Sequence, residues 1–94
     1  MKKITVIMLS WESKSGKEYL PVSAKEDRLD AKELCTELNN IIDEGDLNAL
    51  RTKMVQECMM IPPSLLMACR KGDSEEYDRL KNTLNFFTRA CILK

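Results

Sequence analysis

The sequence predicts an α+β domain in which an N-terminal β-hairpin packs on about four α-helices arranged as two antiparallel helix hairpins. Apolar and β-branched residues fill the first strand of residues 4–23, whereas residues 30–92 repeat apolar positions three and four apart. Two Gly-Asp junctions, Gly45-Asp46 and Gly72-Asp73, each separate two such amphipathic stretches. A chain of 94 residues has room for one hydrophobic core, so we expect a single domain spanning residues 1–94.

The hairpin is predicted from two apolar runs and the polar segment between them. Residues 4–11 favour a strand, and residues 18–22 favour its return. The intervening segment contains Ser15-Gly16, a common turn sequence. Pro21 has no N–H to donate to a neighbouring strand, so the returning strand is expected at a sheet edge or to break there.

The first strand is apolar on both of its faces. Side chains alternate along a strand, so one face carries Ile4, Val6 and Met8, and the other carries Ile7, Leu9 and Trp11. A half-exposed strand would alternate polar and apolar residues instead. Helices of this chain can cover one face, and the second then requires a further helix, a partner subunit or a target. This pattern indicates self-association through the hairpin, or strand addition to a partner.

The first helix is predicted to begin at Asp30, which can cap the helix together with Glu33. Leu29 and Leu34 have the spacing of a hydrophobic staple across that start. The apolar repeat then continues to Gly45, which suits the left-handed position that ends a helix.

Two further helices are predicted before residue 72. Asp46 is expected to cap a second helix that stops before Pro62-Pro63, because a proline disfavours helix at the preceding residue. A third, short helix follows over about residues 64–71.

The fourth helix is predicted to open at Asp73, with Glu76 completing a capping box. Its apolar stripe is formed by Tyr77, Leu80, Leu84, Phe87 and Cys91. Alternatively, residues 90–93 form a third strand beside the hairpin.

The composition argues against most catalytic chemistry. The chain contains no histidine, which removes Ser-His and Cys-His nucleophilic systems and histidine-based metal sites. Two glycine-rich patterns that bind phosphate groups, G-x-x-x-x-G-K-[ST] and G-x-G-x-x-G, are both missing from the sequence. We therefore expect no enzyme activity, no cofactor and no metal site. A small carboxylate-dependent enzyme is retained as an alternative, with Asp27 and Asp30, or Asp43 and Asp46, as its acidic pair. Helix capping and the helix dipole explain each pair better.

The four cysteines are expected to be free thiols of a reducing cytosol, with a disulfide framework as the alternative. They are Cys35, Cys58, Cys69 and Cys91. The apolar run at the N-terminus is too short to span a bilayer. The sequence thus predicts a cytoplasmic protein without membrane contact.

Charge provides a nucleic-acid alternative to protein binding. Basic and acidic residues balance at fifteen each, so no overall field attracts nucleic acid. A basic cluster of Arg51, Lys53, Arg70 and Lys71 is the candidate phosphate-binding surface of a nucleic-acid-binding regulator. Acidic residues after Gly72 would repel DNA from the helix that would have to read it.

These observations favour a small, non-catalytic protein-binding module: an adaptor, regulator or inhibitor, of a size common in bacteria and their phages, that occupies a partner surface. The candidate partner-binding residues are Trp11, Tyr19, Glu33, Glu37 and Glu44. If the hairpin pairs around the Ser15-Gly16 turn, Trp11 and Tyr19 are cross-strand neighbours near its tip and candidate interface anchors. Alternatively, the two side chains pack the hairpin onto the helical core. The three glutamates form an acidic outer face on the first helix.

Overall fold

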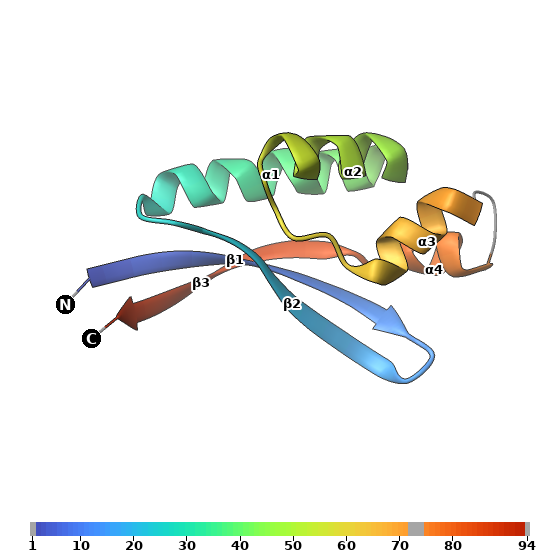
Figure 1. Ribbon diagram of the computed structural model, residues 1–94, viewed down its shortest axis with the longest axis horizontal. Helices are drawn as coiled ribbons and strands as arrows, with labels where there is room; N and C mark the ends of the chain where they lie inside the picture. The colour runs from blue at the N-terminus through green and yellow to red at the C-terminus, as the bar shows by residue number, and fades with distance from the viewer. Residues whose placement is uncertain (1, 72–74, 94) are drawn as a thin grey trace.

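The computed structural model describes residues 2–71 and 75–93, which form three strands and four helices (Figure 1). In chain order these are β1 (Lys2–Ser13), β2 (Gly16–Lys25), α1 (Arg28–Glu44), α2 (Leu47–Gln56), α3 (Pro63–Lys71), α4 (Glu75–Thr83) and β3 (Asn85–Leu93). The predicted α+β class and the N-terminal hairpin are confirmed, and four helices follow the hairpin in the described chain.

The strands form one antiparallel sheet in the order β2-β1-β3, with β1 in the centre. The hairpin turns where Ser13 pairs with Gly16, whose φ of 121° is readily reached only without a side chain. β2 is an edge strand, as the missing N–H of Pro21 predicts. The register shifts beside Pro21, and this bulge adds Val22 to β2 without breaking the strand.

The third strand corrects the prediction for the C-terminal region. A helix running to Cys91 is wrong, because α4 ends at Thr83 and β3 spans Asn85–Leu93. The alternative of a strand over residues 90–93 is right in type, but the strand starts five residues earlier than that. Pairing with β1 explains the change: Phe86 lies opposite Leu9 and is buried in the core. Burying the Phe86 side chain in the sheet stabilises the fold more than one further turn of helix would.

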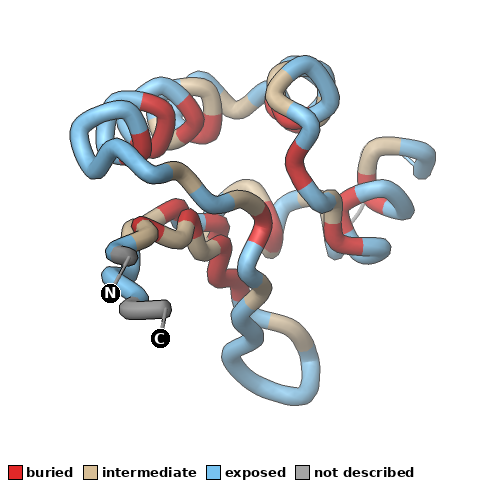
Figure 2. Tube along the Cα trace, turned by 60° about the vertical axis from the view of Figure 1, so that its left-hand side comes forward, coloured by how far each residue is buried: buried red, intermediate tan, exposed pale blue. Residues whose placement is uncertain are grey.

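The helices lie on one side of the sheet, and the hydrophobic core lies between the two layers (Figures 1 and 2). α1 packs along β1 and β3, and α4 packs against β1. The side chains that are completely or almost completely buried come from both layers: Ile7, Leu9, Leu38, Leu47, Leu50, Met54, Pro62 and Leu65. The odd-numbered face of β1 therefore supplies one wall of the core.

The first helix begins three residues earlier than predicted. Its N-cap is Asp27, whose side chain accepts a hydrogen bond from the backbone N–H of Leu29 at 2.8 Å. Asp30, the predicted cap, lies in the first turn, where its charge favours the positive end of the helix dipole. The predicted staple does not form, since Leu29 is 69% exposed.

The Gly45-Asp46 junction between α1 and α2 has the predicted geometry. Gly45 has a φ of 80°, and its N–H donates to the carbonyl of Ile42 at 2.9 Å. The Asp46 carboxylate accepts from the N–H of Ala49 at 3.0 Å, which caps α2. The second junction, Gly72-Asp73, lies outside the described residues, as does the predicted cap of the fourth helix.

Replacing Asp46 with alanine is expected to lower the free energy of unfolding by about 1 kcal/mol, because α2 loses its N-terminal hydrogen bond. Urea denaturation followed by circular dichroism measures this change. Asp43→Ala is the matched control, since Asp43 lies in the last turn of α1, where a negative charge is unfavourable. If Asp43→Ala lowered the free energy of unfolding as much as Asp46→Ala, the cap at Asp46 would contribute nothing specific to stability.

Candidate protein-binding surface

The face of the sheet turned away from the helices is apolar and is not covered by any described helix (Figure 1). Residues that pair across antiparallel strands share a face, so the register defines its members. We call this surface the open face: Ile4, Val6, Met8, Ser10 and Glu12 of β1, Lys17, Tyr19, Pro21 and Ala24 of β2, and Asn85, Phe87, Arg89 and Cys91 of β3. The second apolar face of the first strand, predicted from the sequence, is thus left without a covering layer.

An aromatic pair stands on the open face. The rings of Tyr19 and Phe87 meet edge to face, with centroids 6.3 Å apart. The Lys17 ammonium lies 5.9 Å from the centre of the Tyr19 ring. Tyr19 is 57% exposed and Phe87 is half-buried, so both rings keep surface for a further contact. Tyr19 belongs to β2 and Phe87 to β3, so the two rings come from the strands on either side of β1.

The open face is more basic than acidic. Arg89 is exposed opposite Val6, in the middle of the apolar residues. Lys17 pairs with Glu12 at the end of the same face near the hairpin turn. No ion pair involving Arg89 is found among residues 2–71 and 75–93. An acidic group on a partner would therefore find an available cation beside apolar surface.

Trp11 lies on the other side of the sheet from Tyr19. Trp11 pairs with Glu18, and Tyr19 pairs with Ser10, so the two aromatic residues are not cross-strand neighbours. The Trp11 side chain belongs to the core and is 6% exposed. Its indole Nε1 is buried without a hydrogen-bond acceptor among the described residues. Trp11 therefore anchors the hairpin to the helices and does not share a surface with Tyr19.

The acidic residues of α1 lie on the helical side of the molecule. Glu33, Glu37 and Glu44 are exposed, and the apolar stripe of the same helix is buried. Glu37 accepts a hydrogen bond from Lys53 at 3.1 Å, which neutralises part of this acidic face. Because α1 covers the opposite side of the sheet, these glutamates and Tyr19 do not belong to one site (Figure 1).

The structure divides the predicted basic cluster. Lys53 contacts Glu37 at 3.1 Å and Glu57 at 3.3 Å, and hydrogen bonds to these two carboxylates raise the pKa of Lys53. The ammonium of Lys71 lies 4.0 Å from Glu76. Only Arg51 and Arg70 line a common cleft. Phosphate binding by these four residues together stays a prediction.

Phe87, Arg89 and Cys91 of the open face lie where the sequence predicts a helix, so the sequence did not place them on this face. The signal that could have found them is the period-two pattern of Leu84 and Phe86, both of which are buried.

Comparison with known proteins adds no functional information: no protein-family profile, curated protein or solved structure matches this chain. Among the described residues, no group of three metal-binding side chains comes together. Within the same residues, no helix combines the length and the apolar character needed to cross a membrane. Cys35, Cys58, Cys69 and Cys91 are all free.

Proposed function

We propose that this chain is a non-catalytic protein-binding module, acting as an adaptor, regulator or inhibitor, that receives one amphipathic helix of a partner on its open face. The observation that carries the proposal is the one-sided cover of the sheet. The central strand is apolar on both faces, and the described helices pack on only one of them. Apolar surface of this extent, bordered by polar residues, is typical of an interaction site.

The dimensions of the open face favour a helix over a second copy of the chain. Three strands of about nine residues give a surface of roughly 14 by 30 Å. This matches the diameter of one helix, about 10–12 Å, and the length of about 20 helical residues. A standard stable interface between two folded proteins buries about 800 Å² on each partner. The open face offers roughly half of that area, which suits a peptide-sized, transient contact.

The charges of the open face favour an acidic helix. Arg89 and Lys17 outnumber Glu12 on this surface, so two copies packed face to face would bring like charges together. A partner helix with acidic residues beside its apolar stripe would instead pair with Arg89. The other face of the sheet already binds a helix of this kind, because α1 carries acidic residues beside its apolar stripe and packs against β1 and β3.

A charge reversal tests the proposal. The probe is a fluorescein-labelled helical peptide with leucines at i, i+3, i+4 and i+7 and glutamates elsewhere, and binding is followed by fluorescence anisotropy. Arg89→Glu is expected to weaken binding about tenfold, because it replaces an attraction by a repulsion. Arg28→Glu, an exposed arginine at the start of α1, is the matched control and is expected to bind as the original protein does.

Light scattering at several concentrations tests the choice of occupant. A monomer at all concentrations agrees with the proposal. A dimer that is lost in Arg89→Glu would assign the open face to a second copy and overturn the proposal of a partner helix. Equal peptide affinities for Arg89→Glu and Arg28→Glu would show that the peptide does not bind the open face.

A further inference from the structure

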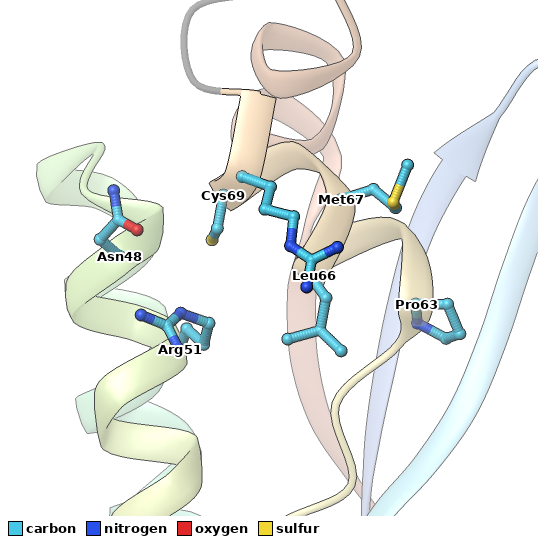
Figure 3. A pocket seen from close by; sticks show the side chains of 7 residues that line it. Asn48, Arg51, Pro63, Leu66, Met67 and Cys69 are labelled. Carbon is cyan, nitrogen blue, oxygen red and sulfur yellow. The ribbon is translucent and has the colours of Figure 1, made fainter.

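A cleft of about 430 Å³ lies between α2 and α3, on the helical side of the molecule. Figure 3 shows side chains of the two helices facing one another across it, with the Cys69 sulfur directed toward α2. The residues that line the cleft are Asn48 and Arg51 of α2, and Pro63, Leu66, Met67, Cys69 and Arg70 of α3. Its volume is in the range of ordinary small-molecule sites.

Two arginines place positive charge in the cleft. Arg51 and Arg70 come from different helices and line the same cleft. Among residues 2–71 and 75–93, no carboxylate forms an ion pair with either guanidinium. The Nε atom of Arg51 is buried and has no hydrogen-bond acceptor in the same part of the chain. The guanidinium groups of Arg51 and Arg70 therefore favour a ligand that brings negative charge and accepts hydrogen bonds.

The thiol of Cys69 does not supply the missing negative charge. Its Sγ donates a hydrogen bond to the carbonyl oxygen of Leu47 at 3.5 Å. Burial raises the pKa of Cys69, and the nearby guanidinium of Arg51 only partly opposes that shift. The thiol therefore adds no negative charge to the cleft at neutral pH.

Apolar surface lies beside the two arginines. Leu66 is 44% exposed and Met67 is 47% exposed, and both side chains line the cleft together with Pro63. The Asn48 amide lines the α2 side and adds both donors and an acceptor. The cleft thus combines a cationic region with an apolar wall. A small inorganic ion would contact the cationic region and leave the apolar wall exposed.

From this arrangement we infer that the cleft binds a small molecule in which one oxyanion, a phosphate or a carboxylate, is attached to an apolar body. Guanidinium groups match the geometry of both oxyanions and donate two hydrogen bonds at once. The apolar body would pack on Leu66 and Met67. This site is separate from the open face, and the inference does not depend on the proposed function.

Nuclear magnetic resonance titration tests the inference with four probes. Phenyl phosphate and sodium benzoate carry the two oxyanions on an apolar ring, benzyl alcohol carries the ring alone, and inorganic phosphate carries the oxyanion alone. At least one of the first two is expected to shift the backbone amides that line the cleft, with a Kd on the order of 1 mM. Comparing them identifies the preferred oxyanion. Benzyl alcohol and inorganic phosphate are expected to bind at least about tenfold more weakly.

Matched arginine variants locate the binding. Arg70→Gln and Arg51→Gln are each expected to weaken binding of the preferred probe about tenfold. Arg28→Gln removes an exposed arginine at the start of α1 and is expected to leave its affinity unchanged. Arg70 is exposed, so its variant tests the site even if Arg51→Gln fails to fold. Absence of shifts in the cleft, equal affinity for benzyl alcohol, or full affinity in Arg70→Gln would overturn the inference.

Discussion

Replacing Leu9 with alanine is expected to lower the free energy of unfolding by about 2–5 kcal/mol. Leu9 has no exposed surface in the centre of β1, where it lies between Leu20 of β2 and Phe86 of β3. Shortening the side chain removes apolar contacts on the helical side of the sheet and leaves a cavity that the surrounding layers can only partly fill. Because a domain of this size is stabilised by roughly 5–15 kcal/mol, the loss is a large fraction of the total.

The neighbouring residue provides the control. Met8 precedes Leu9 in β1 but points to the open face, where it is half-buried. Met8→Ala is therefore expected to cost about 1 kcal/mol or less, because its side chain already contacts solvent. Urea denaturation of the two variants measures the difference. If Met8→Ala were as destabilising as Leu9→Ala, both faces of the sheet would be covered and the open face would not exist.

Replacing Asn39 with alanine is expected to lower the free energy of unfolding by about 1–3 kcal/mol. The Asn39 side chain links α1 to β3: its Nδ2 donates to the carbonyl of Phe86, and its Oδ1 accepts from the N–H of Phe86, both at 2.9 Å. The amide thereby satisfies two backbone groups at the outer edge of β3. Its removal leaves both groups without a protein partner in a partly buried position.

Exchange of the Phe86 amide hydrogen with deuterium distinguishes this tether from general packing. Asn39→Ala is expected to accelerate exchange at Phe86 more than at its core neighbour Leu9. Asn40→Ala removes the adjacent, exposed asparagine and is expected to change stability by less than about 0.5 kcal/mol. Similar stability and exchange in the two variants would show that the Asn39 hydrogen bonds contribute nothing to holding β3.

Features that depend on short stretches of sequence could be predicted. The hairpin turn, the edge position of the strand with Pro21 and the Gly45-Asp46 junction are each fixed by a few neighbouring residues. The helix start was misplaced because Asp27 and Asp30 both suit an N-cap, and only the folded backbone decides between them.

The boundary between α4 and β3 could not be predicted locally. Leu80, Leu84 and Phe87 fit the period of a helix, whereas Leu84 and Phe86 also fit the period of a strand. The partner that decides is β1, at the opposite end of the sequence, since Leu9 pairs with Phe86. Asn39 illustrates the same limit, because its backbone partner is 47 residues away.

The candidate site followed from the sequence only in part. The doubly apolar first strand predicted that a second face needs a cover, and Tyr19 lies on that face. Phe87 and Arg89 complete the face only because β3 pairs with β1, which the helical assignment concealed. Trp11 lies in the core instead, and partner binding by the α1 glutamates stays a prediction.

That a partner helix binds the open face is tested directly by two isoleucines of β1. Ile4 points to the open face and Ile7 to the core, so they are matched methyl probes on opposite sides of one strand. With the acidic helical peptide bound, we expect nuclear Overhauser effects between peptide leucines and the Ile4 methyl groups, and none to Ile7. Peptide contacts confined to the helical layer, with Ile4 unaffected, would contradict the claim.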